Sequence, residues 1–247
     1  MQLTDAHCAI GARPGCREVV SPEDLVSEME RLEVDRALVR VCPSKLAFDV
    51  PAVNRRLYAM AEAYGPIVPC PVVVPDTAGD MPSAEEQVDE CLGKGAGAVF
   101  VRPVLDNWSL EPWACGELFS ALEERRVPVF CHAGQCDVGA VADLAGRHPE
   151  LPLIFPGQGY RSQRTLMPLL ENFAGVHLVV GADYCVFRGL EVGIDAVGAE
   201  RFLFGTNYDE LAMMASMGYL MYADIDEEER GLIGSGNLER LMGGIRR

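Results

Sequence analysis

The sequence predicts a single (β/α)8 barrel of the TIM type that spans residues 1–247, and three observations support this fold class. Short apolar runs alternate with segments of helical periodicity along the whole chain. The runs are nearly continuous rather than alternating, which is typical of parallel strands buried on both faces. Eight such units in 247 residues match the size of one closed barrel. An open, doubly wound sheet is the alternative, but neither glycine-rich phosphate-binding motif follows the first run.

The individual elements follow from the same periodicity. Strands are expected at residues 3–7, 37–41, 67–74, 97–104, 127–132, 151–156, 176–181 and 201–206. Helices are expected at 21–33, 51–64, 83–95, 112–125, 138–147, 163–173, 187–199 and 209–221, with one or two short ones in 226–246. Ser21 with Asp24, and Ser83 with Glu86, have the spacing of capping boxes at two helix starts. The glycine-interrupted stretch 183–199 is where a shortened unit is most expected.

The amino-acid composition limits the classes of molecule that this chain is expected to bind. The formal net charge is −16, and such a field repels the phosphates of nucleic acids and anionic membrane surfaces. Nine scattered cysteines without a C-x-x-C pair are typical of a reducing compartment rather than of a disulfide framework. No basic leader precedes an apolar run, and no uncharged stretch approaches 18 residues. We therefore expect a cytoplasmic protein that binds a small molecule, and neither nucleic acid nor membrane.

Functional side chains of such a barrel lie where strands end and the following loops begin. The predicted strand ends carry, in order, His7, Cys42, the 74–76 stretch, Arg102, His132, Gln158, Asp183 and Asn207. The other two histidines, His148 and His177, fall at the opposite end, where a structural role is expected. Arg40 and Arg102 lie at or near strand ends. Each guanidinium could hold a substrate carboxylate in bidentate fashion, or could pair with a neighbouring Asp or Glu.

Five segments together resemble the amidohydrolase superfamily, in the branch that includes aromatic-acid decarboxylases and small lactone hydrolases. They are "DAHCAIG" (5–11), "VPVFCHAG" (127–134), "HPELPLIFPGQG" (148–159), "RFLFGTNYDE" (201–210) and "IGSGNLERLMG" (233–243). Each segment alone is a weak signal, but the five occur in the family's order on the expected strands. The resemblance covers nearly the whole chain and implies a metal-dependent barrel enzyme.

The departures from the family pattern concern its metal ligands. The resemblance implies ligands at positions 7, 9, 132, 158 (or 157) and 207, and here only His7 and His132 match. Ala9 cannot bind a metal, and the amides of Gln158 and Asn207 are weak, neutral donors that do not suit zinc. We therefore expect an eroded metal site and no cofactor. A divalent metal held weakly by His7 and His132 stays open as an alternative.

Neither neighbouring cysteine is expected to replace the missing ligands. Side chains alternate along a strand, so His7 and Ala9 share one face while Cys8 points to the other, and Cys131 is turned away from His132 for the same reason. Cys8 would need a bulge at this point of the strand, and Cys136 would have to swing in from its loop. Restoring Ala9→His, Gln158→His and Asn207→Asp together is expected to create metal binding.

Two hypotheses for function remain. In the first, the chain is a hydrolase or lyase on a small carboxylate-bearing metabolite that works without metal. His132, His7 and Asp183 are then the expected catalytic residues. Substrate binding falls to Arg102, Gln158 and Asn207, with the two amides donating to an oxyanion. In the second, the chain is a non-catalytic relative that binds a ligand or a partner. The resemblance also leaves a homodimer open.

Overall fold

The computed structural model describes residues 1–12, 19–42, 49–208 and 210–247. Within these residues two sheets form, one in the order β2-β1-β3-β4 and one in the order β5-β6-β7-β8-β9. The strands are β1 (Thr4–Ala12), β2 (Val19–Val20), β3 (Arg36–Val41), β4 (Ile67–Pro69), β5 (Val99–Phe100), β6 (Val129–Phe130), β7 (Leu153–Phe155), β8 (Val176–Val180) and β9 (Phe202–Phe204). All pairs are parallel except β1 with β2.

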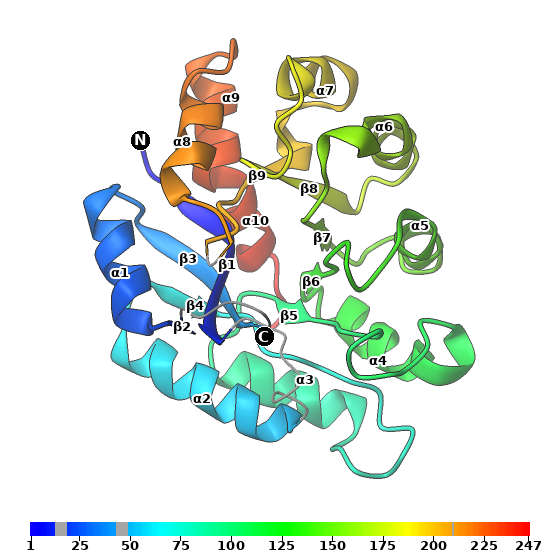
Figure 1. Ribbon diagram of the computed structural model, residues 1–247. Helices are drawn as coiled ribbons and strands as arrows, with labels where there is room; N and C mark the ends of the chain where they lie inside the picture. The colour runs from blue at the N-terminus through cyan, green and yellow to red at the C-terminus, as the bar shows by residue number, and fades with distance from the viewer. Residues whose placement is uncertain (13–18, 43–48, 209) are drawn as a thin grey trace.

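Single parallel bridges join the two sheets at both seams. Val72, just after β4, pairs with Phe100 of β5, and Tyr208, just after β9, pairs with Cys8 of β1. The eight parallel strands of the described chain therefore surround one interior, with the helices outside them (Figure 1). The predicted barrel is confirmed.

The helices occupy the predicted segments. They are α1 (Pro22–Arg31), α2 (Val50–Ala63), α3 (Ala84–Gly93), α4 (Pro112–Glu124), α5 (Val138–Arg147), α6 (Gln163–Asn172), α7 (Gly189–Val197), α8 (Met213–Met221), α9 (Glu227–Gly231) and α10 (Asn237–Gly243). Both predicted capping boxes form, at Ser21 with Asp24 and at Ser83 with Glu86. The unit at 183–199 is not shortened, because α7 forms there. No described helix has both the length and the apolar character needed to cross a membrane.

Several strands differ from the sequence-based expectation, and β5 and β6 have only two residues each where runs of eight and six residues were expected. The short strand β2 pairs antiparallel with the end of β1, at Gly11 and Ala12, and extends it beyond the barrel. The run at 67–74 is a strand only over Ile67–Pro69. Prolines at 69 and 71 lack the N–H that a continuous ladder needs, so the rest of this run makes isolated bonds to its neighbours.

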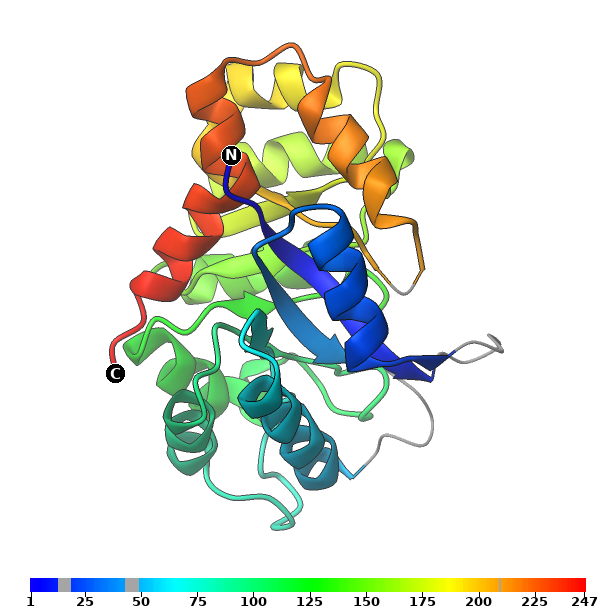
Figure 2. The same cartoon turned by 90° about the vertical axis from the view of Figure 1, so that its left-hand side faces the viewer.

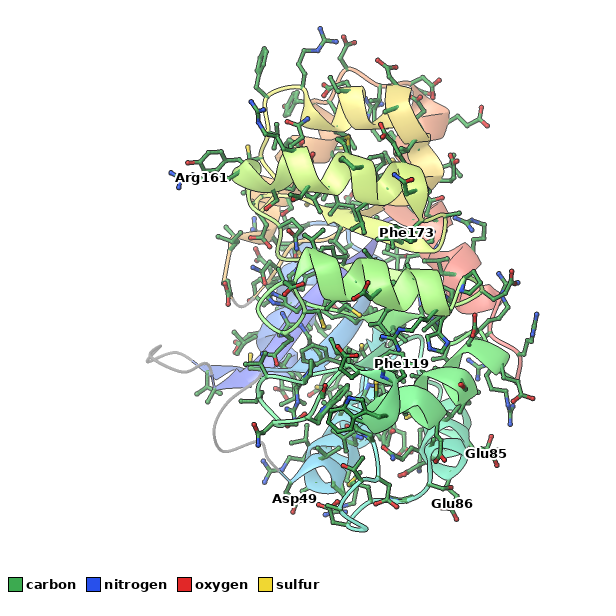
Figure 3. All side chains as sticks on the ribbon, turned by 90° about the vertical axis from the view of Figure 1, so that its right-hand side faces the viewer. Asp49, Glu85, Glu86, Phe119, Arg161 and Phe173 are labelled. Atoms are coloured by element: carbon green, nitrogen blue, oxygen red, sulfur yellow. The ribbon has the colours of Figure 1, made fainter. Side chains whose placement is uncertain are left out.

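The core has two layers separated by the strands. The inner layer fills the barrel and includes Leu38, Phe100, Phe130, Ile154, Val179 and Leu203. The outer layer packs the strands against the helices, and Phe119 of α4 belongs to it (Figure 3). At the end where β1 begins, α10 adds Leu238 and Leu241 to the inner layer and covers the barrel (Figure 2).

The alternation of side chains along each strand decides which of them reach the open end of the barrel. Because strand residues two apart share a face, the residues two positions after Leu38, Phe100 and Phe130 also face inward, one level nearer the strand ends. These residues are Arg40, Arg102 and His132. The sequence thus delivers two guanidinium groups and an imidazole to the mouth of the barrel.

Candidate active site

A buried aspartate fixes the part of β1 in which His7 lies. Asp5 Oδ1 accepts hydrogen bonds from the backbone N–H groups of His7 (2.8 Å) and Thr206 (3.0 Å). Its Oδ2 accepts from the Cys8 thiol (3.0 Å) and from the Thr206 hydroxyl. Burial raises the pKa of Asp5, while these donors act in the opposite direction. Asp5 therefore ties β1 to the chain after β9 and sets the position of the His7 backbone.

Cys8 does not turn toward the barrel interior. The ladder between β1 and β3 does shift its register between Asp5 and Cys8, as a bulge would. The thiol nevertheless lies in the outer layer and is bonded to Asp5, and burial raises its pKa well above the ordinary value. Cys131 and Cys136 are likewise part of the outer layer. The three thiols are therefore packing groups of the outer layer and are absent from the interior face that carries His7.

His7 is held between a guanidinium and a carboxylate. Arg40 Nη2 donates to His7 Nε2 over 2.8 Å, and because a guanidinium has no lone pair, Nε2 must be unprotonated. The ring proton is then on Nδ1, which lies 3.8 Å from Asp183 Oδ2. Burial, followed by the charge of Arg40 and the neighbouring His132, lowers the pKa of His7 well below 6.5. His7 is therefore a neutral imidazole whose Nε2 accepts a hydrogen bond from Arg40 and whose Nδ1 lies near Asp183, beyond hydrogen-bond distance.

Arg40 is a buried cation at the centre of the site. Its side chain is 5 % exposed, and its guanidinium lies 5.6 Å from the ring centroids of both Phe100 and Phe130. Its Nε has no hydrogen-bond partner, and no carboxylate of the described residues forms an ion pair with it. A buried charge without a counter-ion is costly, and the described residues supply no counter-ion for this guanidinium.

His132, at the end of β6, faces His7 at a ring-centroid distance of 5.6 Å. Its Nδ1 accepts from the Gly134 N–H (3.0 Å), which leaves the proton of the neutral ring on Nε2. Burial, and then the charge of Arg40, lower the pKa of His132 to about 4. Nε2 lies over Gly157, where a Cβ atom would come within 2.7 Å of it. His132 therefore presents an N–H group to the site at neutral pH.

The polar groups after β8 and β9 form a second part of the site. Asn207, in the left-handed region at φ 52°, donates from Nδ2 to Asp183 Oδ1 (3.2 Å) and Glu210 Oε2 (3.5 Å). Its Oδ1 has no partner, and neither has the Nε2 of the buried Gln158. Asn207 thus orients two carboxylates. Substrate binding by Asn207 and Gln158 stays a prediction, supported by these unused atoms.

Arg102 pairs with a neighbouring aspartate, the second of the two roles expected for it. Its Nε and Nη2 donate to Asp106 Oδ2 (2.9 Å) and Oδ1 (2.8 Å), and the side chain is fully buried. Substrate binding by Arg102 remains a prediction, while the guanidinium that contacts His7 belongs to Arg40. The alternation that places Leu38 in the interior was the sequence signal that could have selected Arg40.

A cavity of about 520 Å³ opens beside this cluster, between the loops that follow β3, β4 and β5. Asp106 and Trp108 line it, as does Asp49. Figure 3 labels Asp49 at the start of α2. None of the six predicted site residues is among its lining residues in the described chain. The cavity is therefore not the His7–Arg40 cluster itself, and its lining includes Asp106, the partner of Arg102.

The two remaining histidines lie away from this cluster, as expected. His148 Nδ1 is 2.8 Å from Glu123 Oε2, and its ring packs 5.9 Å from that of Phe119. His177 donates from Nδ1 to the Gly175 carbonyl (3.1 Å) at the start of β8. The His148 contact joins the end of α5 to α4, the His177 contact is local to the start of β8, and both are structural.

Comparison with known proteins places the chain in a family. The sequence profile of the amidohydrolase family matches residues 10–243. The chain belongs to the amidohydrolase family. This membership agrees with the resemblance of the five sequence segments and with the barrel. Among curated proteins, no sequence match is found.

Solved structures of similar fold include three that cover nearly all of this amidohydrolase family member. An uncharacterised TIM-barrel protein from Bordetella bronchiseptica has 17% identity and a TM-score of 0.76, with 100% of each chain covered. A 2,6-dihydroxybenzoate decarboxylase from Rhizobium has 16% identity and a TM-score of 0.75, covering 98% of this chain and 99% of that one. A dihydroxybenzoic acid decarboxylase from Polaromonas sp. JS666, solved with manganese and the inhibitor 2-nitroresorcinol, has 14% identity, a TM-score of 0.77 and coverage of 98% and 97%.

The residues present here do not fit a catalytic metal of the kind that the family pattern implies. Position 9 is an alanine, and the amides at 158 and 207 are poor ligands for a transition metal. The Nε2 lone pair of His7 is taken by Arg40, and the Nδ1 lone pair of His132 by the Gly134 N–H. Among the described residues no three His, Cys, Asp or Glu side chains converge as a metal site requires.

Proposed function

We propose that this amidohydrolase family member is a hydrolase or lyase that acts on a small carboxylate-bearing compound without a tightly bound metal. One observation carries the proposal: the contact of Arg40 with His7, beside His132, gathers a fixed positive charge and two neutral imidazoles at the barrel mouth. A decarboxylase among the structural relatives, solved with 2,6-dihydroxybenzoate bound, supports a carboxylate substrate.

The hydrogen bonds around the two imidazole rings suggest which catalytic role each side chain has. His7 Nε2 and His132 Nδ1 already accept hydrogen bonds, so neither ring offers a free lone pair. His132 instead offers Nε2–H, and a neutral imidazole N–H can stabilise negative charge that develops on a substrate oxygen. This differs from the base that the sequence suggested for His132. It makes His132 an electrophile.

The general base is then a carboxylate. Asp183 accepts a hydrogen bond from Asn207 Nδ2, its Oδ2 lies 3.8 Å from His7 Nδ1, and its side chain is 24% exposed. A carboxylate in this position can accept the proton of an attacking water, a step that the amide of Asn207 cannot perform. The proposed arrangement is Asp183 as base, His132 as oxyanion donor, and Arg40 as the group that holds the substrate anion.

The alternative, a non-catalytic ligand-binding protein, has support from the same contacts. If both engaged lone pairs stay engaged, the cluster can recognise an anion but has only carboxylates with which to move protons. The two functions share a binding step and differ in turnover.

The test is a screen of lactones, amides and aromatic carboxylates with protein dialysed against a chelator. We expect turnover that falls at least a hundredfold in His132→Gln and in Asp183→Asn, with His148→Gln as the control because His148 lies away from the cluster. Turnover that survives in both variants places the active site elsewhere. Binding without turnover across the screen favours the ligand-binding alternative.

A further inference from the structure

We infer that Arg40 is the cation of this site: its guanidinium fills the space at which a metal ligand set would converge, and it binds an anionic oxygen pair, a carboxylate, from the ligand. The inference deepens the proposed function, since it names the group that recognises the substrate. It rests on the proposed function only for the identity of the site, because anion binding can be measured without turnover.

The strand register places Arg40 directly beside the position where a family ligand is missing. Arg40 on β3 pairs with Ala9 on β1 in the parallel ladder, so both side chains face the interior at the same level. Ala9 is completely buried and contributes only a methyl group. A histidine at position 9 would have to share this level with the guanidinium. The small side chain of Ala9 therefore leaves the space that the guanidinium of Arg40 occupies.

The contact with His7 also makes Arg40 a chemical competitor of a metal ion. Coordination of a metal by His7 Nε2 requires the lone pair that Arg40 Nη2 now occupies at 2.8 Å. A divalent ion at this place would also lie against a permanently charged guanidinium. The site thus has a positive charge beside His7 of β1, and this charge comes from the side chain of Arg40.

Two buried donors are still unused. The Nε of Arg40 and the Nε2 of Gln158 have no partner, although their side chains are only 5 % and 4 % exposed. A carboxylate can accept two parallel hydrogen bonds from one guanidinium edge, and an amide N–H can add a third. The rings of Phe100 and Phe130 flank Arg40 at 5.6 Å and keep its charge in apolar surroundings. These surroundings favour a small organic carboxylate over a hydrated inorganic ion.

The experiment measures binding of benzoate by calorimetry to the full chain, with the neutral isostere benzamide as the matched probe. We expect the natural sequence to bind benzoate and to discriminate against benzamide. Arg40→Gln should weaken benzoate binding at least tenfold, and Arg40→Lys, which keeps the charge but loses the bidentate edge, should lie between them. Arg36→Gln is the control, because Arg36 lies on the same strand and pairs with Glu239.

The possible results separate cleanly. Equal benzoate affinity in Arg40→Gln and in the natural sequence overturns the inference, and so does a natural sequence that binds neither probe or both alike. Arg40-dependent binding of benzoate together with no turnover in the substrate screen upholds the inference while it contradicts the proposed enzymatic function. Thermal unfolding of each variant shows whether a lost affinity reflects a lost fold.

Discussion

Arg40 donates a hydrogen bond to Nε2 of His7 over 2.8 Å, and through this contact a histidine at which the sequence resemblance implies a metal ligand accepts from a protein cation. The same guanidinium helps to lower the pKa of both His7 and His132. The mouth of the barrel is thus organised around a positive charge from β3, with two neutral imidazoles beside it.

We predict that restoring the family's ligands alone does not create metal binding in this chain, in contrast to the expectation from the sequence, because Arg40 occupies the Nε2 of His7. The triple change Ala9→His, Gln158→His and Asn207→Asp leaves Arg40 on the Nε2 of His7 and in the space beside position 9. We expect well under 0.1 equivalent of manganese or zinc after dialysis, measured by elemental analysis. Adding Arg40→Ala should raise this value at least fivefold. A triple variant that already binds one equivalent contradicts the prediction.

Gly157 is expected to be essential for the use of His132. A Cβ atom there would lie 2.7 Å from Nε2, and the φ of 78° is itself unfavourable for alanine. Gly157→Ala should therefore displace the ring and reduce turnover or carboxylate affinity at least tenfold, with a loss of about 1 kcal/mol in stability. Gly159→Ala is the matched control, because no atom lies within 4 Å of its added methyl and its φ is negative. Equal effects of the two substitutions would falsify this role.

Asp5 is expected to be a structural residue despite its place in the motif. Asn in its place would present an NH₂ group toward donors, and buried hydrogen bonds from His7, Cys8 and Thr206 would be lost. We expect Asp5→Asn to lower the free energy of unfolding by about 2–4 kcal/mol in urea. Thr206→Val, which removes only the hydroxyl donor, should cost less, about 1 kcal/mol. A stable Asp5→Asn protein that has lost only its ligand affinity assigns Asp5 to the site instead.

His177 should contribute to instability in acid. Burial, followed by the charges of Arg201 and Arg240, lowers its pKa from 6.5 to about 3 in the folded protein. Between these values the unfolded chain binds the proton more readily, so stability falls as the pH falls from 6.5 toward 3 and no further below it. The contribution between pH 7 and pH 5 is about 2 kcal/mol.

The measurement for this prediction is urea unfolding of the natural sequence and of His177→Gln across that pH range. The variant should show a loss between pH 7 and pH 5 that is smaller by about the same 2 kcal/mol, because glutamine does not titrate. The slopes of the two proteins should converge below pH 3. Parallel curves over the whole range would show that His177 is not responsible.

Local sequence was enough to predict most of the fold. Apolar runs and helix starts are properties of neighbouring residues, and for this reason the barrel, the capping boxes of Ser21 and Ser83, and the helix over 189–197 could all be found. The prolines at 69 and 71 were visible too, but their shortening of β4 was overlooked. The alternation rule placed Cys8 on the outer face even though β1 carries an irregularity beside it.

The candidate site was predictable from the sequence only in part. The sequence by itself determined which groups reach the open end of the barrel, including His7, His132, Asp183 and Asn207, because strand direction and side-chain alternation are local. The pair of Arg102 with Asp106 is also local, since the two residues are four positions apart. Only the tertiary structure decided that Arg40 stands beside Ala9 and bonds to His7. That contact depends on the register between two strands that are distant in the chain, and on which ring nitrogen is left to accept, and neither is encoded in any short stretch of residues.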